Sequence, residues 1–283
     1  GSTVYIHFYV PNRASEVLTK NPYWTGQFSD EQAFAAKMKE LNATAEEAEW
    51  VRGHFRAWAD DHIVAIDAAT GATRWRTVMP ARSPNLQTHK HRGNFGVPLV
   101  VGDLLLAPNL AGRLYALDAD TGSLRWEFPA FKGPPAAGGG TPGPHNPSPI
   151  LVGGRLVIWA IGGKVYALDR ATGGELWSFK ASNIVFSSPF LSAGKVVFAS
   201  IDGRVYALEE SGGGLAWSLK LPGFVWLAPA GDGVFYACSH GDTLAAISVQ
   251  DGKELWDFRG RDLLQGSVFT LGGLVCAFNQ QGE

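Results

Sequence analysis

Three histidines are placed where they could bind one metal ion. His89 and His91 form a His-x-His pair, and His145 lies further along the chain. On an extended backbone, residues two apart point to the same side, so the first two imidazoles can face one ligand. No carboxylate accompanies them, and Lys90 and Arg92 flank them instead. We therefore predict no metal here, and an anionic group is the alternative ligand of these side chains.

A second group of residues is rich in aromatic rings and side-chain amides. Its members lie three residues before prolines that begin predicted strands, at the matching place in the last repeat, or beside such residues. Rings and amides together suit a planar or sugar-like ligand, although ordinary loop closure would use the same residues. The full set of predicted ligand-binding residues is His89, His91, Arg92, Asn94, His145, Asn146, Phe186, Trp226 and Gln265.

No motif of a known catalytic type accompanies these residues. The chain contains no GxSxG elbow, phosphate-binding loop or HExxH sequence. Its two cysteines, Cys238 and Cys276, lack the spacing of a metal or redox site, and we expect two isolated buried thiols. Most acids stand in segments such as LDADTG and LDRATG, where they cap tight turns by bonding to backbone N–H groups. Catalytic residues therefore stay unassigned.

The elements that position these residues are repeats. Five segments each read as an alternating apolar strand, a turn rich in Asp and Gly, and a second strand that ends in Trp. They are HIVAIDAATGATRW (62–75), RLYALDADTGSLRW (113–126), KVYALDRATGGELW (164–177), RVYALEESGGGLAW (204–217) and TLAAISVQDGKELW (243–256). The tryptophans are 51, 51, 40 and 39 residues apart. Repeats made only of strands at about this period predict a β-propeller.

A second pair of strands precedes four of these hairpins. The pairs lie at 97–109, 148–160, 188–200 and 228–239. Four antiparallel strands, here A to D, make one propeller blade. We therefore predict an all-β propeller of five to six blades, some partial, as a single domain over 1–283. Residues 3–10 read as a lone B strand and 265–283 as an A–B pair, so the ring closes through them or the chain is a segment of a larger propeller.

Three insertions interrupt the repeats. In an antiparallel blade the A–B and C–D turns share one side, so the B–C and D–A connections share the other. The insertions 11–61, 78–96 and 129–147 are all of the second kind and are predicted on one face. Capping boxes at Ser29 and Thr44 predict a helical insertion in the first of them. It is either a lid that docks a partner or a cap over the propeller surface.

The motif YALDxxTGxxxW resembles the PQQ-like β-propeller repeat over roughly residues 62–283. That family includes quinoprotein alcohol dehydrogenases and a non-enzymatic lipoprotein of the outer-membrane barrel assembly machinery. The resemblance implies a periplasmic or secreted protein. It also implies that the repeat tryptophan docks between neighbouring blades. By this resemblance we expect the same structural role, docking between blades, of Trp75, Trp126, Trp177, Trp217 and Trp256.

The dehydrogenases of that family need a specific set of residues to bind their cofactor. Their pyrroloquinoline quinone lies with a calcium ion held by Glu, Asn and Asp. The predicted ligand-binding residues contain no acid, and the nearest acids, Asp60 and Asp61, precede an outer strand. The adjacent cysteines of many such enzymes and a CxxCH haem site are also absent. We therefore predict no cofactor and a non-catalytic propeller that binds a protein, peptide or carbohydrate. A dehydrogenase using the quinone and calcium, or an inactive relative, is the alternative.

Composition narrows the partners further. The chain has 24 basic and 26 acidic residues, which gives no electrostatic case for nucleic acid or an anionic membrane. The sequence contains no run of about eighteen apolar residues, so it predicts no membrane-spanning helix. The first residues do not read as a signal peptide. The sequence makes no prediction about oligomeric state.

Overall fold

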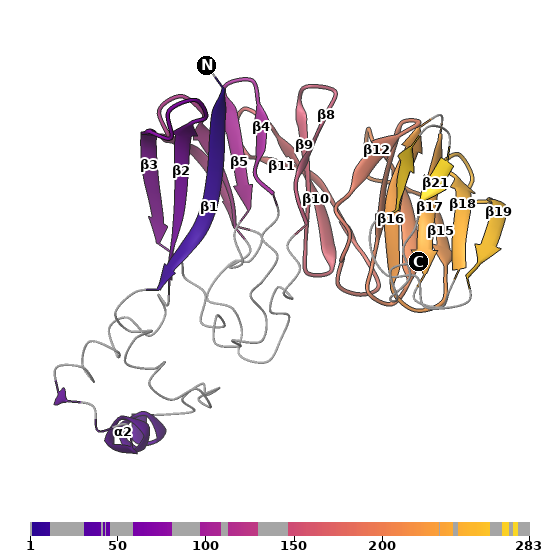
Figure 1. The fold of residues 1–283 in the computed structure, drawn as a ribbon. Coiled ribbons are helices and arrows are strands. Elements are labelled where there is room, and N and C mark those ends of the chain that lie inside the picture. Colours follow the sequence, from indigo (N-terminus) through magenta and orange to yellow (C-terminus); the bar gives the residue numbers. More distant parts are fainter. Residues whose placement is uncertain are drawn as a thin grey trace. The chain divides into compact units, whose positions relative to one another are not determined.

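The computed structural model describes residues 2–11, 31–40, 42, 44–45, 59–80, 97–108, 113–129, 147–231, 233–239, 243–260, 268–271 and 274–276. These residues are almost entirely β (Figure 1). The chain divides into two compact units, Gly1–Pro144 and His145–Glu283. The prediction of a single domain over 1–283 stays a prediction.

Four of the sheets are complete blades, in which four antiparallel strands pair in chain order. The first unit holds β4 (Leu99–Val101), β5 (Leu104–Pro108), β6 (Arg113–Asp118) and β7 (Leu124–Pro129). The second unit holds β8 (Ile150–Val152), β9 (Leu156–Ile161), β10 (Lys164–Asp169) and β11 (Glu175–Lys180), then β12 (Phe190–Ser192), β13 (Lys195–Ala199), β14 (Arg204–Glu209) and β15 (Leu215–Lys220), then β16 (Val225–Gly231), β17 (Val234–Ser239), β18 (Thr243–Ser248) and β19 (Glu254–Arg259). The predicted fold of four-stranded propeller blades is therefore confirmed.

Two further sheets are partial. One consists of β1 (Thr3–Pro11), β2 (Ala59–Asp67) and β3 (Thr73–Pro80), and the other of β20 (Phe269–Leu271) and β21 (Leu274–Cys276). The first pairs as strands B, C and D of a blade, and the second pairs as strands A and B. Whether the ring closes or the blades continue stays open.

One helix, α2 (Glu31–Glu40), lies within the predicted insertion 11–61. It begins two residues after Ser29, the first residue of the predicted capping box. The side chain of Met38 is buried. The residues that would form the second helix after Thr44 lie, except for Ala45, outside the described part of the chain. A helical insertion over the whole of 11–61 therefore stays a prediction.

Every hairpin between strands C and D is built in the same way. The strand register shifts just after an alanine, at Ala65, Ala116, Ala167, Ala207 and Ala246. Four residues after the last residue of strand C, each hairpin has a glycine with φ between 69° and 74°. Its N–H donates to the carbonyl oxygen of that last residue. These glycines are Gly71, Gly122, Gly173, Gly213 and Gly252. This left-handed conformation costs little only for glycine. The repeated Gly of the sequence motif is thus a backbone requirement.

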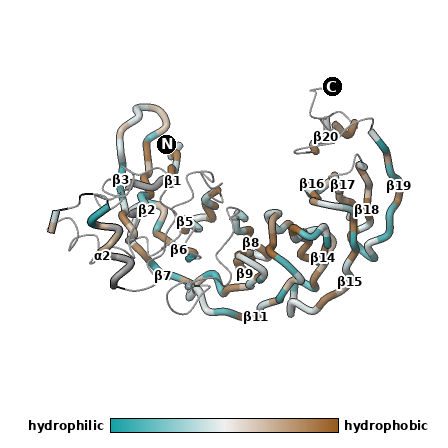
Figure 2. Tube along the Cα trace, turned by 90° about the horizontal axis from the view of Figure 1, so that it is seen from below, coloured by the Kyte–Doolittle hydropathy of each residue, from teal (hydrophilic) through white to brown (hydrophobic). Residues whose placement is uncertain are grey.

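Within each of the two units, apolar cores fill the space between consecutive sheets. Between the blades β12–β15 and β16–β19, the rings of Trp217 and Phe235 stack with centroids 6.1 Å apart and planes at 7°. Val197, Ala207 and Ile247 beside them are fully buried. Burial of a side chain such as Ile247 contributes about 2 kcal/mol. Figure 2 shows hydrophilic colours along much of β19, the outer strand of its blade.

Candidate binding face

The two sides of each blade are defined by different hydrogen bonds. On one side, the backbone N–H after strand C donates to the carbonyl of the A–B turn of the same blade. These bonds are Ala119 to Asp103 (2.9 Å), Arg170 to Arg155 (2.8 Å), Glu210 to Gly194 (3.1 Å) and Val249 to Gly233 (2.7 Å). Ala68 donates in the same way to Ser2 (2.9 Å) in the three-stranded sheet. We call this side the turn face.

The opposite side carries the B–C turns and the D–A connections. Ala181 and Val185, in the connection after β11, donate to Gly163 and Gly162 in the B–C turn of their own blade, at 2.9 and 2.6 Å. Leu221, after β15, donates to Gly203 at 2.9 Å. B–C turns and D–A connections therefore share one side, as antiparallel pairing requires. We call it the connection face.

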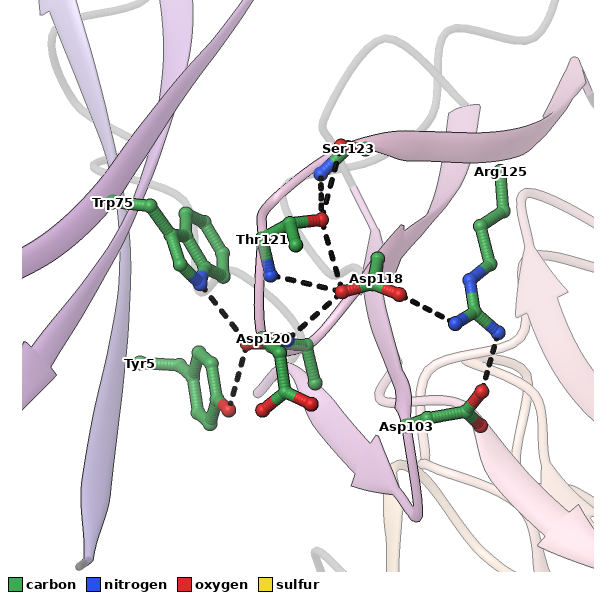
Figure 3. Close-up of polar contacts among 9 residues, drawn as sticks. Tyr5, Trp75, Asp103, Asp118, Asp120, Thr121, Ser123 and Arg125 are labelled. Atoms are coloured by element: carbon green, nitrogen blue, oxygen red, sulfur yellow. Dashed lines mark hydrogen bonds and ion pairs between the residues drawn. The ribbon is translucent and has the colours of Figure 1, made fainter.

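On the turn face, tryptophans contact the turn of the next blade. Trp75 Nε1 donates to the carbonyl oxygen of Ala119 at 2.9 Å, and the Tyr5 hydroxyl donates to the same oxygen at 3.2 Å (Figure 3). A Cβ placed on Gly122 would lie 2.5 Å from Trp75 Cε3. The indole therefore needs a glycine at this position for contact as well as for backbone conformation.

The other tryptophans of the repeat differ in their surroundings. Trp217 Nε1 donates to the Val249 carbonyl at 2.8 Å. Trp177 contacts Gly213 in the same way, yet its buried Nε1 has no hydrogen-bond partner among the described residues. Trp126 is buried, whereas Trp256 is 43% exposed. A docking role common to all five tryptophans stays a prediction.

The acids of the turn face are held in their turns. Asp118 Oδ1 accepts hydrogen bonds from the backbone N–H groups of Asp120 and Thr121 and from the Thr121 hydroxyl (Figure 3). The Arg125 guanidinium bonds Asp118 Oδ2 and, with the Thr121 bonds, lowers the pKa of Asp118 to about 2. The same arrangement with Arg74 lowers the pKa of Asp67 to about 2. Such carboxylates are turn caps and poor proton acceptors at neutral pH.

On the connection face, three aromatic side chains come together, Phe186 and Phe224 from two successive D–A connections and Trp226 from the start of strand β16. The ring of Phe186 lies 6.0 Å from that of Phe224 and 6.1 Å from that of Trp226, measured between centroids. The second pair meets edge to face at 81°. Phe224 is 42% exposed, and the other two are half-buried. The three side chains, which we call the aromatic cluster, thus present an apolar surface that is accessible at Phe224 and partly buried at Phe186 and Trp226.

A polar network lies next to this cluster. Asp202, in the turn between β13 and β14, accepts a hydrogen bond from the Ser182 hydroxyl at 2.7 Å and another from the Ser200 hydroxyl. The Tyr206 hydroxyl donates to Ser182 Oγ at 2.7 Å. Partial burial raises the pKa of Asp202, but the bonds from Ser200 and Ser182 outweigh it and leave that pKa below its ordinary value. The carboxylate is therefore negatively charged at neutral pH.

The backbone joins the aromatic cluster to the network. Gly223 precedes Phe224 of the cluster, and Gly203 follows Asp202 of the network. The two glycines lie so close that a Cβ on Gly203 would be 2.2 Å from the Gly223 carbonyl oxygen. Lys220 Nζ, at the end of β15, contacts the Asp202 carbonyl oxygen. An apolar surface beside a fixed negative charge can hold an apolar side chain and a donor group of one ligand.

The structure brings together two of the predicted ligand-binding residues, Phe186 and Trp226. Sequence reasoning missed Phe224, the most exposed member of the cluster. Alternation was the available signal, because Phe224 stands two residues before Trp226 and so shares its side of an extended backbone. The remaining predicted residues, His89, His91, Arg92, Asn94, His145, Asn146 and Gln265, lie outside the described residues.

Comparison with protein families shows which family the chain belongs to. A family model described as outer membrane protein assembly factor BamB matches residues 59–142 and 135–283. The chain belongs to this BamB family of PQQ-like repeat propellers. The crystal structure of BamB from Moraxella catarrhalis superposes with a TM-score of 0.54 at 20% identity, over 80% of this chain and 68% of that one.

Other similarities show how widely the blade is used. The quinohemoprotein alcohol dehydrogenase ADHIIG from Pseudomonas putida HK5 matches with a TM-score of 0.51 at 16% identity, over 71% of this chain and 40% of that enzyme. The serine/threonine-protein kinase AfsK of Streptomyces griseus is 36% identical over 129 residues. That match covers 42% of this chain and only 14% of the kinase. At these identities the solved structures show the shared fold alone.

The described residues do not fit the calcium site of the quinoprotein alternative. Among them, no three His, Cys, Asp or Glu side chains lie close enough to hold a metal ion. Calcium needs several oxygen ligands, including carboxylates, and Asp67, Asp118 and Asp169 are engaged in turns. No step through a quinone follows from these residues.

Two findings concern the cysteines and the membrane. Cys238 is buried and Cys276 half-buried, and both thiols are free. Burial raises the pKa of the Cys238 thiol to about 11, which makes it a poor nucleophile. In the part of the chain that the structure describes, no helix is both long and apolar enough to cross a membrane.

Proposed function

We propose that this BamB-family chain is a non-catalytic propeller that binds an extended polypeptide on its connection face. The observation that carries the proposal is the aromatic cluster of Phe186, Phe224 and Trp226. Partly exposed aromatic rings on a rigid base are frequent anchors of protein interfaces, because they bury a large apolar area at small entropic cost. On the turn face, by contrast, Trp75 and Trp217 are already engaged with the turn of a neighbouring blade.

The family supports a polypeptide as ligand. Its description is that of an assembly factor for outer membrane proteins, whose strands alternate apolar and polar side chains. The alternating rings would enter the aromatic cluster, and donor groups of the ligand would face Asp202. The proposal places the protein in the periplasm, where such strands travel, and includes the insertions 11–61, 78–96 and 129–147 as further binding elements of their own blades.

A binding titration tests the proposal directly. The probe is a fluorescein-labelled ten-residue peptide that alternates aromatic and polar residues, followed by fluorescence polarisation. Phe224→Ala should weaken binding by about tenfold or more. It should leave the melting temperature nearly unchanged, because the ring is partly in solvent. The control is Leu191→Ala, which removes an exposed apolar side chain near the turn face.

The result also separates ligand classes. A β-linked glucose hexamer is titrated in parallel as the carbohydrate probe. If the wild-type chain binds the hexamer and not the peptide, the polypeptide proposal is wrong even where Phe224→Ala abolishes that binding. Equal peptide affinity for the wild type and Phe224→Ala would show that the aromatic cluster is not the site.

A further inference from the structure

The two outer strands of the blades β8–β11 and β12–β15 carry pairs of like charge at their connection-face ends. Lys164, at the start of β10, pairs with Lys180 at the end of β11. Arg204, at the start of β14, pairs with Lys220 at the end of β15. The three lysines are exposed and the arginine is half-buried. Like charges directly opposite each other destabilise paired strands, so both blades carry an electrostatic cost at the same place.

The blade β4–β7 shows how a cation at this place is otherwise neutralised. Arg113 begins β6 as Arg204 begins β14, and it forms an ion pair with Glu127 on the adjacent strand. Strand register gives the residues at the place of Glu127 in the other two blades as Ser178 and Ser218. A serine supplies no counter-charge, so the cations of these two blades keep their positive field.

The contacts of the second pair are with uncharged groups. Arg204 Nη1 donates to Ser218 Oγ at 3.4 Å, and Lys220 Nζ donates to the Asp202 carbonyl oxygen. Within the described part of the chain, none of the four cations forms an ion pair. The Asp202 carboxylate lies nearby, but both its oxygens already accept hydrogen bonds from serine hydroxyls. One carboxylate beside four cations leaves an excess of positive charge.

The positive pairs adjoin the aromatic cluster. Lys220 stands four residues before Phe224, and Gly223 between them packs on Gly203, the residue before Arg204. The connection face of these blades therefore joins an apolar anchor to a basic surface.

We propose that the polypeptide bound on the connection face is acidic, with its aromatic side chains in the aromatic cluster and its carboxylates against the two positive pairs. This rests on the polypeptide binding proposed above and adds the class of ligand. Complementary charge selects partners at an interface. A carboxylate between two cations also relieves the repulsion that the free protein carries, so binding recovers a stabilisation that the unliganded blades lack.

Fluorescence polarisation with three labelled peptides tests the acidic ligand. The peptides share their aromatic positions, and their polar positions are all Glu, all Gln or all Lys. The acidic peptide should bind about fivefold more tightly than the neutral one at about 0.02 M salt. The difference should shrink at about 0.3 M salt, where exposed charges are screened. The basic peptide should bind most weakly.

Two variants locate the effect. Ser218→Glu supplies the counter-charge that Glu127 supplies in its own blade, and Lys180→Gln removes one cation. Each should weaken binding of the acidic peptide about threefold and leave the neutral peptide unaffected. Neither should lower the melting temperature, because each relieves like-charge repulsion. The control Ser211→Glu adds the same charge to an exposed turn on the opposite face and should keep the preference of the wild type.

The outcomes separate the class of ligand from the binding itself. Equal affinity for the acidic and neutral peptides, or tightest binding of the basic one, would refute the acidic ligand, and if Phe224→Ala still weakened binding the proposed function would stand. Binding of no peptide would overturn both. An equal loss with Ser211→Glu would show only an effect of net charge and refute the site.

Vesicles that contain phosphatidylglycerol are the other anionic probe. Co-sedimentation with these vesicles that Ser218→Glu abolishes, together with no advantage of the acidic peptide over the neutral one, would show that the pairs face a membrane and overturn the proposal. Tighter binding of the acidic peptide that depends on Ser218 and Lys180 would support it.

Discussion

On the turn face the same few residues recur in every blade, whereas on the connection face successive blades use different ones. The C–D turns share an acid or serine, a left-handed glycine and a following tryptophan. The B–C turns range from Gly162-Gly163 to the Ser200–Gly203 segment with its ionised Asp202. Two of the repeated tryptophans, Trp75 and Trp217, donate a hydrogen bond to the turn of the next sheet. Residues free to vary are where a ligand-binding surface can develop.

Variation on the connection face does not mean loose packing. The aromatic cluster stands on the contact between Gly203 and the backbone of Leu221–Gly223, where a Cβ has no room. On the turn face, the corresponding restriction comes from indole side chains, which can shift. Both faces are therefore closely packed at these glycines, one against backbone and the other against side chains.

Three glycines of the blade β12–β15 separate these effects. All three have positive φ, 81° at Gly203, 69° at Gly213 and 71° at Gly194. A Cβ added to Gly203 would lie 2.2 Å from a backbone oxygen, and one added to Gly213 would lie 2.4 Å from an indole carbon. A Cβ added to Gly194 would meet no atom within 4 Å. Alanine should reduce the free energy of unfolding by about 4, about 3 and about 1 kcal/mol in that order, since steric overlap adds to backbone strain. Urea denaturation of the three variants measures the series.

Gly194→Ala serves as the internal control in that series, because it carries the backbone cost alone. Equal losses for Gly194→Ala and Gly213→Ala would mean that the indole gives way without cost. The turn face would then be the softer of the two.

A pair of tryptophan substitutions tests how the turn face is stabilised. Trp217→Phe removes the 2.8 Å bond to the Val249 carbonyl and leaves that buried acceptor unpaired. Trp177→Phe removes an Nε1 that has no partner among the described residues. Trp217→Phe should therefore cost about 1–2 kcal/mol more than Trp177→Phe. Melting temperatures and urea midpoints give the comparison, and a larger loss for Trp177→Phe would contradict it.

The smallest effect is expected from the acids of the turn face. The pKa of Asp118 is about 2 in the folded chain, below the roughly 3.9 of an unfolded chain. Its stabilisation is therefore present above about pH 4 and is lost as the pH falls towards 2. Asp118→Asn should flatten the acid limb of a plot of melting temperature against pH.

The neighbouring substitution Asp120→Asn is the matched control, because the Asp120 carboxylate has no hydrogen-bond partner among the described residues. Identical acid limbs for the wild type and Asp118→Asn would show that the Arg125 pair contributes nothing to folding.

Much of the fold could be predicted because its signals are local. Alternation, turn glycines and terminal tryptophans located the strands of all six described sheets, including the lone B strand at β1 and the A–B pair at β20 and β21. Parity of antiparallel strands then separated the two faces. The three helical and loop insertions lack such repetition, and most of their predicted residues lie outside the described ranges.

The aromatic cluster was predictable only in part. Phe186 and Trp226 were reached by counting back from the prolines that begin the predicted A strands, although the structure begins β16 before Pro229, at Val225. The contacts of Phe186 with Phe224 and Trp226 depend on the approach of two segments that are distant in sequence. No local pattern encodes that distance, because it is set by how one blade packs on the next.

The sequence by itself determined the blades, the turn chemistry and the side on which each connection lies, since each follows from periodicity over a few residues. Only the tertiary structure decided the state of each repeated tryptophan. Trp177 and Trp217 occupy the same place in the motif, yet one indole lacks the acceptor that the other finds. A hydrogen bond across two packed sheets depends on their separation and tilt to within a fraction of an ångström. That is a property of the packed sheets and of no single repeat.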